Sequence, residues 1–342
     1  MKRVRLLSLL VVMFACGIAA RAQVLAGPNR PATVPEGYLV TPMGYFHPSC
    51  VKEVARGDIL RPDEMAIRHP NGSFSAMHVC AYPHFTADGK EVPLNPSDDT
   101  ATAKGETVPL GPSKDAKVEP PPFIGHSWIE AIYARTSSSY GAISTEFKVP
   151  SGPASHDGQT LYFFPGLQDF GNVKTILQPV LGWNADFRNA WGIASWNCCV
   201  KGTVFKSPGE HTATGHVIYG VIVNQCSAGT LSCRLWTVNT KDLTSGAFSK
   251  LFNESNFGQT FDWGFGAVLE VYNVARCSDY PGGSKGKLTS YNVNFYNNKF
   301  QKIAAPTWFL WKVWLGPPAK SPVCGYGGFL NTASGSAMTL TY

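Results

Sequence analysis

The chain has 342 residues and a formal net charge of +6 at pH 7. Four of its basic residues, and no acidic ones, lie within the first 22 positions, so the remainder carries a formal charge of only +2. The Lys and Arg residues form no dense cluster, which excludes the usual footprint of a nucleic-acid-binding protein and a polybasic membrane patch.

Residues 1–22 have the three parts of a secretory signal peptide. A basic start precedes an apolar run, and Ala20-Arg21-Ala22 provides a small-x-small cleavage site before Gln23. The apolar run is about ten residues long, well below the ~20 residues that a membrane-spanning helix needs. We therefore expect a secreted protein, extracellular or periplasmic, with no membrane partner.

The chain contains nine cysteines, of which Cys16 leaves with the signal peptide. An even set in an oxidising compartment predicts up to four disulfides. A zinc site is disfavoured because two cysteines are adjacent and the others lack paired C-x₂-C and H-x₃-H spacing, so we expect no metal and no cofactor. Cys50 and Cys80 are expected to form a local bridge, and the other pairings stay open. The disulfide candidates are Cys50, Cys80, Cys198, Cys199, Cys226, Cys233, Cys277 and Cys324.

Residues 23–123 form a polar segment that is rich in turn-forming residues. Its later part, from Val92 to Pro122, is studded with prolines and is expected to be a linker. Upstream, Gly37 to Phe85 holds aromatic residues and two cysteines, enough for a small folded unit. We expect an N-terminal prosegment, either a propeptide that shields or chaperones the downstream domain or an accessory module.

Residues 124–342 consist of short alternating runs bounded by Gly, Pro, Asn and Ser. Such runs, for example from Gly215 and from Ala267, predict β-strands, and helical periodicity is nearly absent. A length of about 215 residues suits one all-β domain with two packed sheets. We therefore expect an antiparallel two-sheet β-sandwich, jelly-roll or concanavalin-like, which would be the catalytic domain of an enzyme.

The stretch from Val173 to Trp196 carries the most informative pattern, since no nucleophile elbow, His-Glu-x-x-His helix, P-loop or dinucleotide fingerprint occurs in this region. It resembles the secreted glutamic peptidases. In their eqolisin branch a strand of the form I-L-Q-T-G-V-D-W carries the catalytic glutamine. Gln178 matches that glutamine, although Pro179 follows where those enzymes have Thr. Together with its flanking strands, the resemblance spans about residues 137 to 280.

The chain also resembles the neprosin branch of these peptidases. That branch ends its active-site strand in W-G-G-E-V, which is similar to the stretch from Asp262 and points to Glu270. Glu270 lies two residues late relative to the eqolisin strand, a shift that keeps a side chain on the same face. The resemblance implies a secreted, acid-acting glutamic endopeptidase made as a zymogen, with a Gln178/Glu270 dyad and a polypeptide substrate.

The chemistry of such a dyad follows from its side chains. A glutamate carboxylate can take a proton from a water molecule as the water attacks a peptide carbonyl. A glutamine amide can donate a hydrogen bond to the oxyanion, and losing one such donor typically costs ~10²-fold in rate. Four tryptophans are candidates to hold the extended peptide: Trp183, Trp191, Trp196 and Trp263.

Simpler interpretations exist for each of these residues. A single Gln in a strand is usually solvated or hydrogen-bonded across the sheet, and Pro179 beside it suggests an edge or a bulge. A Glu between Leu269 and Val271 is usually the outward member of an alternating strand. Tryptophans in a sandwich are more often core than cleft. Glu130 and Glu146 are reserve candidates for the acid.

The alternative function is that of a non-catalytic carbohydrate-binding β-sandwich, because such sandwiches commonly present aromatic side chains to sugar rings. A glycoside hydrolase is disfavoured, since retaining hydrolysis needs two carboxylates and one of the two positions is Gln178. The sequence indicates neither oligomeric state nor cleavage specificity. The peptidase hypothesis requires Gln178 and Glu270 to lie on neighbouring strands and to converge in one groove.

Overall fold

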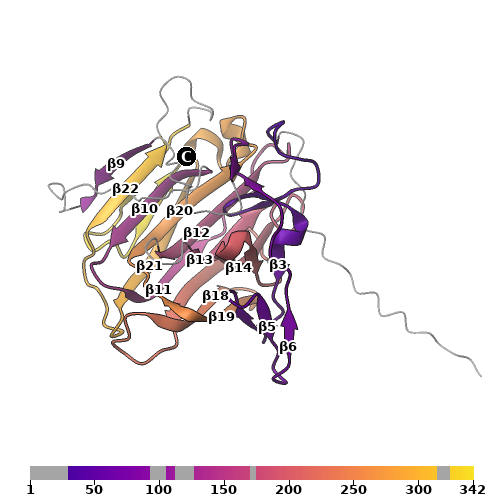
Figure 1. Cartoon of the computed structure of the whole chain (residues 1–342). Helices are drawn as coiled ribbons and strands as arrows, with labels where there is room; N and C mark the ends of the chain where they lie inside the picture. The colour runs from indigo at the N-terminus through magenta and orange to yellow at the C-terminus, as the bar shows by residue number, and fades with distance from the viewer. Residues whose placement is uncertain (1–29, 93–104, 112–126, 170–174, 314–323) are drawn as a thin grey trace, which may run out of the picture.

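The computed structural model describes residues 30–92, 105–111, 127–169, 175–313 and 324–342. The predicted signal peptide, residues 1–22, lies outside them. Within the described residues the fold is all-β, and its two large sheets pack face to face as a sandwich, as predicted (Figure 1). None of the short helical turns in these ranges is long and apolar enough to cross a membrane.

One large sheet, here called the central sheet, lies between the other two. Its strands are antiparallel except for the β15–β3 pair. In spatial order they are β3 (Val51–Glu53), β15 (Val204–Lys206), β14 (Trp191–Cys198), β13 (Thr175–Trp183), β12 (Thr160–Asp169), β20 (Trp263–Tyr272), β10 (Trp128–Arg135), β22 (Trp308–Val313) and β9 (Gly105–Pro109), with β16 (Glu210–His211) beside β14.

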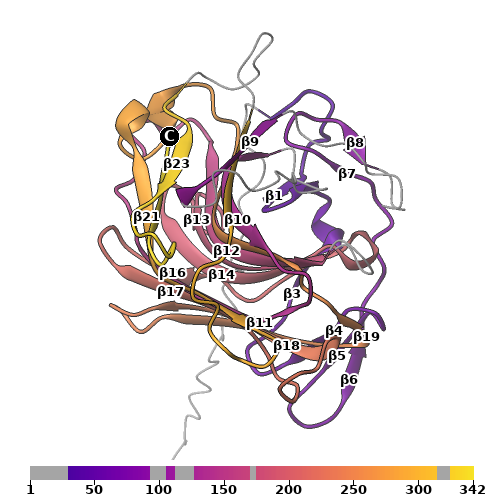
Figure 2. The same cartoon turned by 90° about the vertical axis from the view of Figure 1, so that its left-hand side faces the viewer.

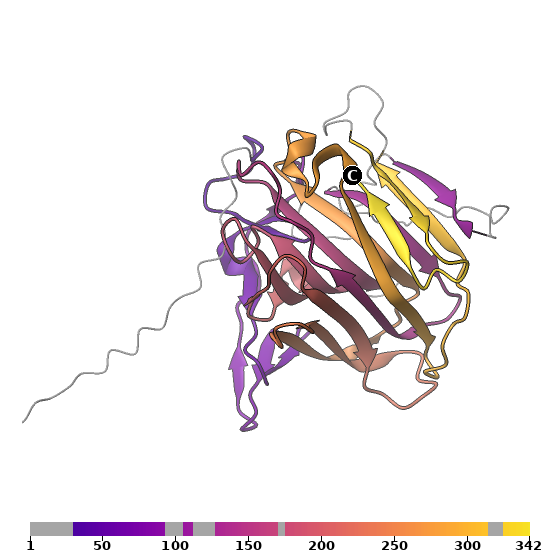
Figure 3. The ribbon, with the colours of Figure 1, turned by 180° about the vertical axis from the view of Figure 1, so that it is seen from behind.

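The second large sheet, the outer sheet, packs on one face of the central sheet. Its order is β23 (Gly327–Leu330), β24 (Met338–Thr341), β21 (Lys287–Asn297), β11 (Tyr140–Lys148), β17 (Val217–Asn224), β18 (Cys233–Asp242), β19 (Phe248–Gln259), β4 (Ile59–Arg61), β5 (Ala66–Arg68) and β6 (Phe74–Ala76). Seen from behind, the yellow strands near the C-terminus lie at the front of the molecule (Figure 3).

A small N-terminal sheet covers the opposite face of the central sheet. It comprises β1 (Leu39–Thr41), β2 (Gly44–Phe46), β7 (His84–Phe85) and β8 (Glu91–Val92). Figure 2 shows these indigo strands beside the curved central sheet, on the side away from β21 and β23. Short 3-10 turns occur at Pro48–Cys50, Val200–Gly202, Cys277–Asp279 and Gly283–Lys285.

The central strands are buried on both faces. Along β20, Leu269 and Val271 belong to the core shared with the outer sheet, whereas Val268 and Tyr272 belong to the core shared with the N-terminal sheet. Every residue of β12, β13 and β20 is buried. A strand covered on both sides requires a near-continuous hydrophobic run, so a polar side chain at such a position needs a partner or a purpose.

The N-terminal segment is woven into both large sheets. Strand β3 extends one edge of the central sheet and β9 the other, while β4 extends the outer sheet. Strand β9 lies within the stretch from Val92 to Pro122 that the sequence suggested as a linker. Part of that stretch is therefore a sheet strand, in which Thr107 and Val108 pair with β22. These additions cover strand edges that would otherwise expose unpaired backbone groups.

The prediction of four disulfides is confirmed, and so is the local bridge between Cys50 and Cys80. That bridge ties β3 to the chain just before β7 and so holds the N-terminal sheet against the central sheet. The other pairs, which the sequence left open, are Cys198–Cys199, Cys226–Cys233 and Cys277–Cys324.

Candidate active site

Gln178 and Glu270 both point from the central sheet toward the N-terminal sheet. Leu177 and Leu269, which directly precede them on their strands, face the outer sheet. Adjacent residues of a strand point to opposite faces, so Gln178 and Glu270 face away from the outer sheet. Both side chains are fully buried. The two residues therefore share one face, as the peptidase hypothesis requires.

The two residues do not lie on neighbouring strands, so this part of the hypothesis is wrong. Strand β12 runs between β13 and β20. Its Tyr162 pairs with Glu270 of β20 on one side and with Gly182 of β13 on the other side. Gln178 lies four residues before Gly182 on β13. From strand spacing and rise, the two positions are separated by about 10 Å across the sheet and about 13 Å along it. One peptide bond cannot contact both side chains in this arrangement.

Glu270 is held by three hydrogen-bond donors. The hydroxyls of Ser127 and Tyr272 donate to Oε1, the latter at 2.6 Å, and the indole Nε1 of Trp128 donates to Oε2 at 3.1 Å. A carboxylate oxygen has two lone pairs, so these donors leave one acceptor position on Oε2. Burial raises the pKa of Glu270 to about 7, although the three hydrogen bonds oppose this shift.

The N-terminal segment contacts the residues that neighbour Glu270. The hydroxyl of Tyr162 donates to the main-chain carbonyl of Val40 at 3.0 Å. Tyr45 packs edge-on against Tyr272, with 5.3 Å between ring centroids, and its hydroxyl donates to Oδ1 of Asn273 at 3.0 Å. The N-terminal sheet thus closes the face of the central sheet from which the carboxyl group projects.

Gln178 lies in an environment that does not satisfy its amide. Neither its Oε1 nor its Nε2 has a hydrogen-bond partner among the described residues. Nearby, Pro165 and Pro179 fall in a gap of the β12–β13 pairing, between the pairs at Phe163 and Leu167. Pro179 thus lies in a central strand, not at an edge. Leaving such an amide unpaired costs about 1–3 kcal/mol, a cost that a bound polar ligand would remove.

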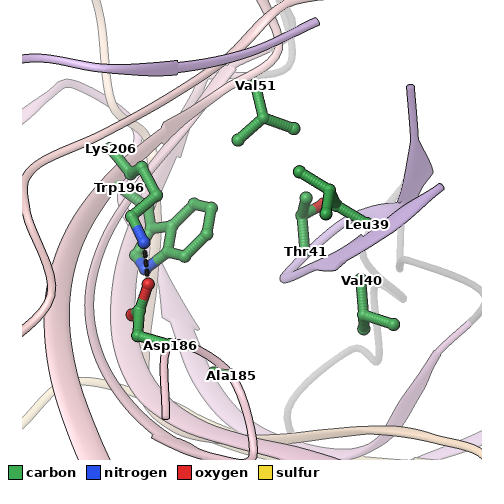
Figure 4. A pocket seen from close by; sticks show the side chains of 8 residues that line it. All are labelled: Leu39, Val40, Thr41, Val51, Ala185, Asp186, Trp196 and Lys206. Carbon is green, nitrogen blue, oxygen red and sulfur yellow. Dashed lines mark hydrogen bonds and ion pairs between the residues drawn. The ribbon is translucent and has the colours of Figure 1, made fainter. Parts of the chain in front are cut away.

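A small pocket lies between β1 and the central sheet. Figure 4 shows Leu39 and Thr41 on one side and Trp196 and Lys206 on the other. The buried ammonium group of Lys206 forms an ion pair with Asp186 and lies 5.0 Å from the centroid of the Trp196 ring. Trp196, which lines the pocket, is the register partner of Gln178 on the neighbouring strand.

The four candidate tryptophans divide between the two faces. Trp196 and Trp263 lie on the face of Gln178 and Glu270. Trp183 and Trp191 lie in the core toward the outer sheet, 5.3 Å apart edge to face, so the expectation that they line the cleft is not met. The reason is strand alternation, because Trp183 follows Gln178 by an odd number of residues.

The reserve acids lie elsewhere. Glu130 is fully buried, accepts a hydrogen bond from the Gly327 amide at 2.7 Å, and has a pKa that burial raises well above its ordinary value. Glu146 is on the outer sheet and accepts a hydrogen bond from the side-chain amide of Asn292.

Across the described ranges, no three His, Cys, Asp or Glu side chains gather as metal ligands would.

Sequence reasoning missed the residues that surround Glu270: Ser127, Trp128, Tyr162 and Tyr272. Tyr272 lies two positions from Glu270, so strand periodicity alone places it on the same face. The other three come from β12 and from the start of β10, which are more than a hundred residues away in sequence. No local pattern indicates that these strands flank β20.

Neither a protein-family model nor a curated protein matches the chain. Among solved structures it is similar to scytalido-glutamic peptidase with a transition-state analogue inhibitor, at 14% identity and a TM-score of 0.43, over 63% of this chain and 98% of that one. It is also similar to SCP-B, an eqolisin in complex with the tripeptide Ala-Ile-His, at 13% identity and a TM-score of 0.39, over 63% of this chain and 98% of that one. The lectin UEA-II complexed with galactose follows at 12% identity and a TM-score of 0.25, over 60% of this chain and 77% of that one.

Proposed function

We propose that the chain is the secreted precursor of a peptidase and that the covered face of the central sheet is its catalytic groove. The observation that carries this proposal is the environment of Glu270, a buried carboxyl group held by three donors, whose cross-strand neighbour Tyr162 binds main chain of the N-terminal segment. A buried acid with a strongly perturbed pKa is typical of a functional site. Residues 1–22, 23–123 and 124–342 are then leader, prosegment and catalytic domain.

Glu270 is the general base of the proposed reaction. Its carboxylate takes a proton from a water molecule while the water oxygen bonds to the carbonyl carbon of the substrate. The protonated carboxyl group then gives this proton to the amide nitrogen as the C–N bond breaks. The products are a carboxylic acid and an amine, so the step is balanced without a metal or cofactor.

Gln178 has a binding role in this proposal. It lies too far from Glu270 to act on the same peptide bond, unlike in the dyad suggested by the sequence. Its unsatisfied amide can instead pair with main-chain groups of a substrate farther along the groove. The neighbouring indole of Trp196 supplies an apolar wall there.

The N-terminal segment keeps the precursor latent. Its strands cover the face of the central sheet on which Glu270 lies, its Val40 carbonyl binds the neighbouring Tyr162, and burial raises the pKa of the Glu270 carboxyl group to about 7. When the segment leaves, water reaches the carboxyl group and its pKa falls toward the ordinary range, because burial is the main cause of the shift. The carboxylate is then ionised in weak acid, which suits an acid-acting enzyme.

The test is cleavage of a denatured protein by the full-length secreted chain from about pH 2 to about pH 8. Glu270→Gln should lower the rate by ~10²-fold or more, as expected for a general base, and Gln178→Ala should mainly raise KM. The matched control is Glu146→Gln, which removes a carboxylate of the catalytic domain on the outer sheet, where it accepts a hydrogen bond from Asn292. Folding is checked by circular dichroism. Absence of cleavage at every pH, together with oligosaccharide binding, would support the carbohydrate-binding alternative instead.

A further inference from the structure

We propose that Tyr162 is a catalytic residue whose hydroxyl donates a hydrogen bond to the carbonyl oxygen of the scissile peptide bond. This assignment rests on the proposed peptidase function. It fills the role that the sequence suggested for Gln178, which lies too far from Glu270 to contribute.

Tyr162 and Glu270 are direct cross-strand neighbours. They are register partners on β12 and β20, and both side chains point toward the N-terminal sheet. Directly opposite residues of an antiparallel pair have Cβ atoms about 5 Å apart. The Tyr162 ring also lies 6.1 Å from that of Tyr272, whose hydroxyl binds the same carboxyl group.

The hydroxyl of Tyr162 differs from the other donors in what it binds. Tyr272, Ser127 and Trp128 all donate to the carboxyl group of Glu270 and so fix its orientation. Tyr162 donates to the main-chain carbonyl of Val40, at 3.0 Å. This peptide carbonyl of the N-terminal segment stands in for the carbonyl of a substrate.

Tyr162 remains a donor throughout the working pH range. In the precursor it is fully buried, and burial together with the neighbouring Glu270 raises its pKa well above the ordinary value of 10.0. Once it is uncovered, its pKa falls toward that ordinary value, which still leaves the phenol neutral in weak acid. A neutral phenol can stabilise an oxyanion by a hydrogen bond without transferring its proton. Glu270 therefore handles the proton of the attacking water, and Tyr162 handles the charge that develops on the carbonyl oxygen.

Loss of the Tyr162 hydroxyl should act on the transition state more than on substrate binding. In Tyr162→Phe, we expect kcat to fall by ~10²-fold while KM changes less than about threefold. A peptide aldehyde, whose hydrate resembles the tetrahedral intermediate, should lose affinity by a similar factor, and a product peptide should not. The matched control is Tyr280→Phe, which removes a buried hydroxyl bonded to Tyr326 in the other core.

Each protein, including Glu270→Gln, is expressed as the full-length chain and assayed once activation has removed its N-terminal segment. If the wild type cleaves and Glu270→Gln does not, but Tyr162→Phe keeps the wild-type kcat, this assignment is overturned while the proposed function stands. If KM rises and aldehyde affinity is unchanged, Tyr162 has only a structural role. If the wild type shows no cleavage at any pH, the proposed function and this assignment fall together.

Discussion

Tyr162 lies directly opposite Glu270 on the neighbouring strand and binds a main-chain carbonyl of the N-terminal segment. This relationship joins the candidate catalytic carboxyl group to the segment that covers it. Because Glu270 is fully buried and the N-terminal sheet covers its face of the central sheet, we expect access of water and substrate to require that sheet to leave. The contacts that hold this sheet in place should therefore set the rate of activation.

Weakening the contact between Tyr45 and the central sheet should speed activation. Tyr45→Phe removes the hydrogen bond to Asn273, which typically contributes about 1 kcal/mol, so we expect the lag before cleavage to shorten about fivefold. A time course of substrate cleavage in weak acid measures the lag. The matched variant is Tyr38→Phe, whose hydroxyl binds Pro83 within the N-terminal segment itself and should have a smaller effect. Equal lags in wild type and Tyr45→Phe would contradict this role of the contact.

The stability of the precursor should fall as the pH rises through weak acid. Burial raises the pKa of Glu270 from 4.5 to about 7 in the folded chain. The folded state then holds this proton where the unfolded chain has lost it, so the stabilisation is complete below about pH 4.5 and is lost as the pH approaches about 7. Linkage sets the loss at the order of 3 kcal/mol.

Glu270→Gln should remove this part of the pH dependence, because glutamine does not titrate. The measurement is the free energy of unfolding in urea for both proteins at several pH values. Glu130 also has a raised pKa, so it adds its own pH dependence to the free energy of unfolding. This contribution is the same in the wild type and in Glu270→Gln, and it cancels when the two profiles are subtracted. Parallel pH profiles for the two proteins would show that Glu270 does not titrate as proposed.

Gln178 should show a conflict between stability and function. Gln178→Met keeps the volume but removes two buried polar groups without partners, so the free energy of unfolding should rise by about 1 kcal/mol. KM should rise at the same time if the amide binds substrate. Urea unfolding and steady-state kinetics on the same preparation test both effects. A variant that is more stable and has an unchanged KM would leave Gln178 as a structural residue.

The ion pair between Lys206 and Asp186 should be strongly coupled. Lys206 is 1% exposed and Asp186 11%, so removing one partner leaves a buried charge and costs about 3–5 kcal/mol. The double variant Lys206→Met/Asp186→Leu should recover most of that loss. A double-mutant cycle of unfolding free energies measures the coupling, and additive single effects would contradict it.

Sequence periodicity is enough to predict the sandwich, because alternating runs such as β17 bury every second residue. The shared face of Gln178 and Glu270 also follows from alternation, and the same reasoning excludes Trp183 from that face. The position of β12 between β13 and β20 does not follow from any local pattern, since it depends on which strands pair across the whole chain. The missing dyad contact and the role of Tyr162 depend on this pairing alone.

The N-terminal segment illustrates the same limit. Its composition and the Cys50–Cys80 bridge predict a small folded unit. Its contribution of edge strands to both large sheets depends on distant register partners, such as Leu60 with Asn253. Short strands of three residues, flanked by turns, carry too little periodicity to reveal such partners.

The most direct test of the account is the ratio of kcat/KM between wild type and Glu270→Gln on one peptide in weak acid. Both proteins are assayed after loss of the N-terminal segment, with matching circular dichroism spectra. The account predicts that the variant is at least ~10²-fold slower, as for loss of a general base. Two folded proteins that cleave the peptide at the same rate would contradict it.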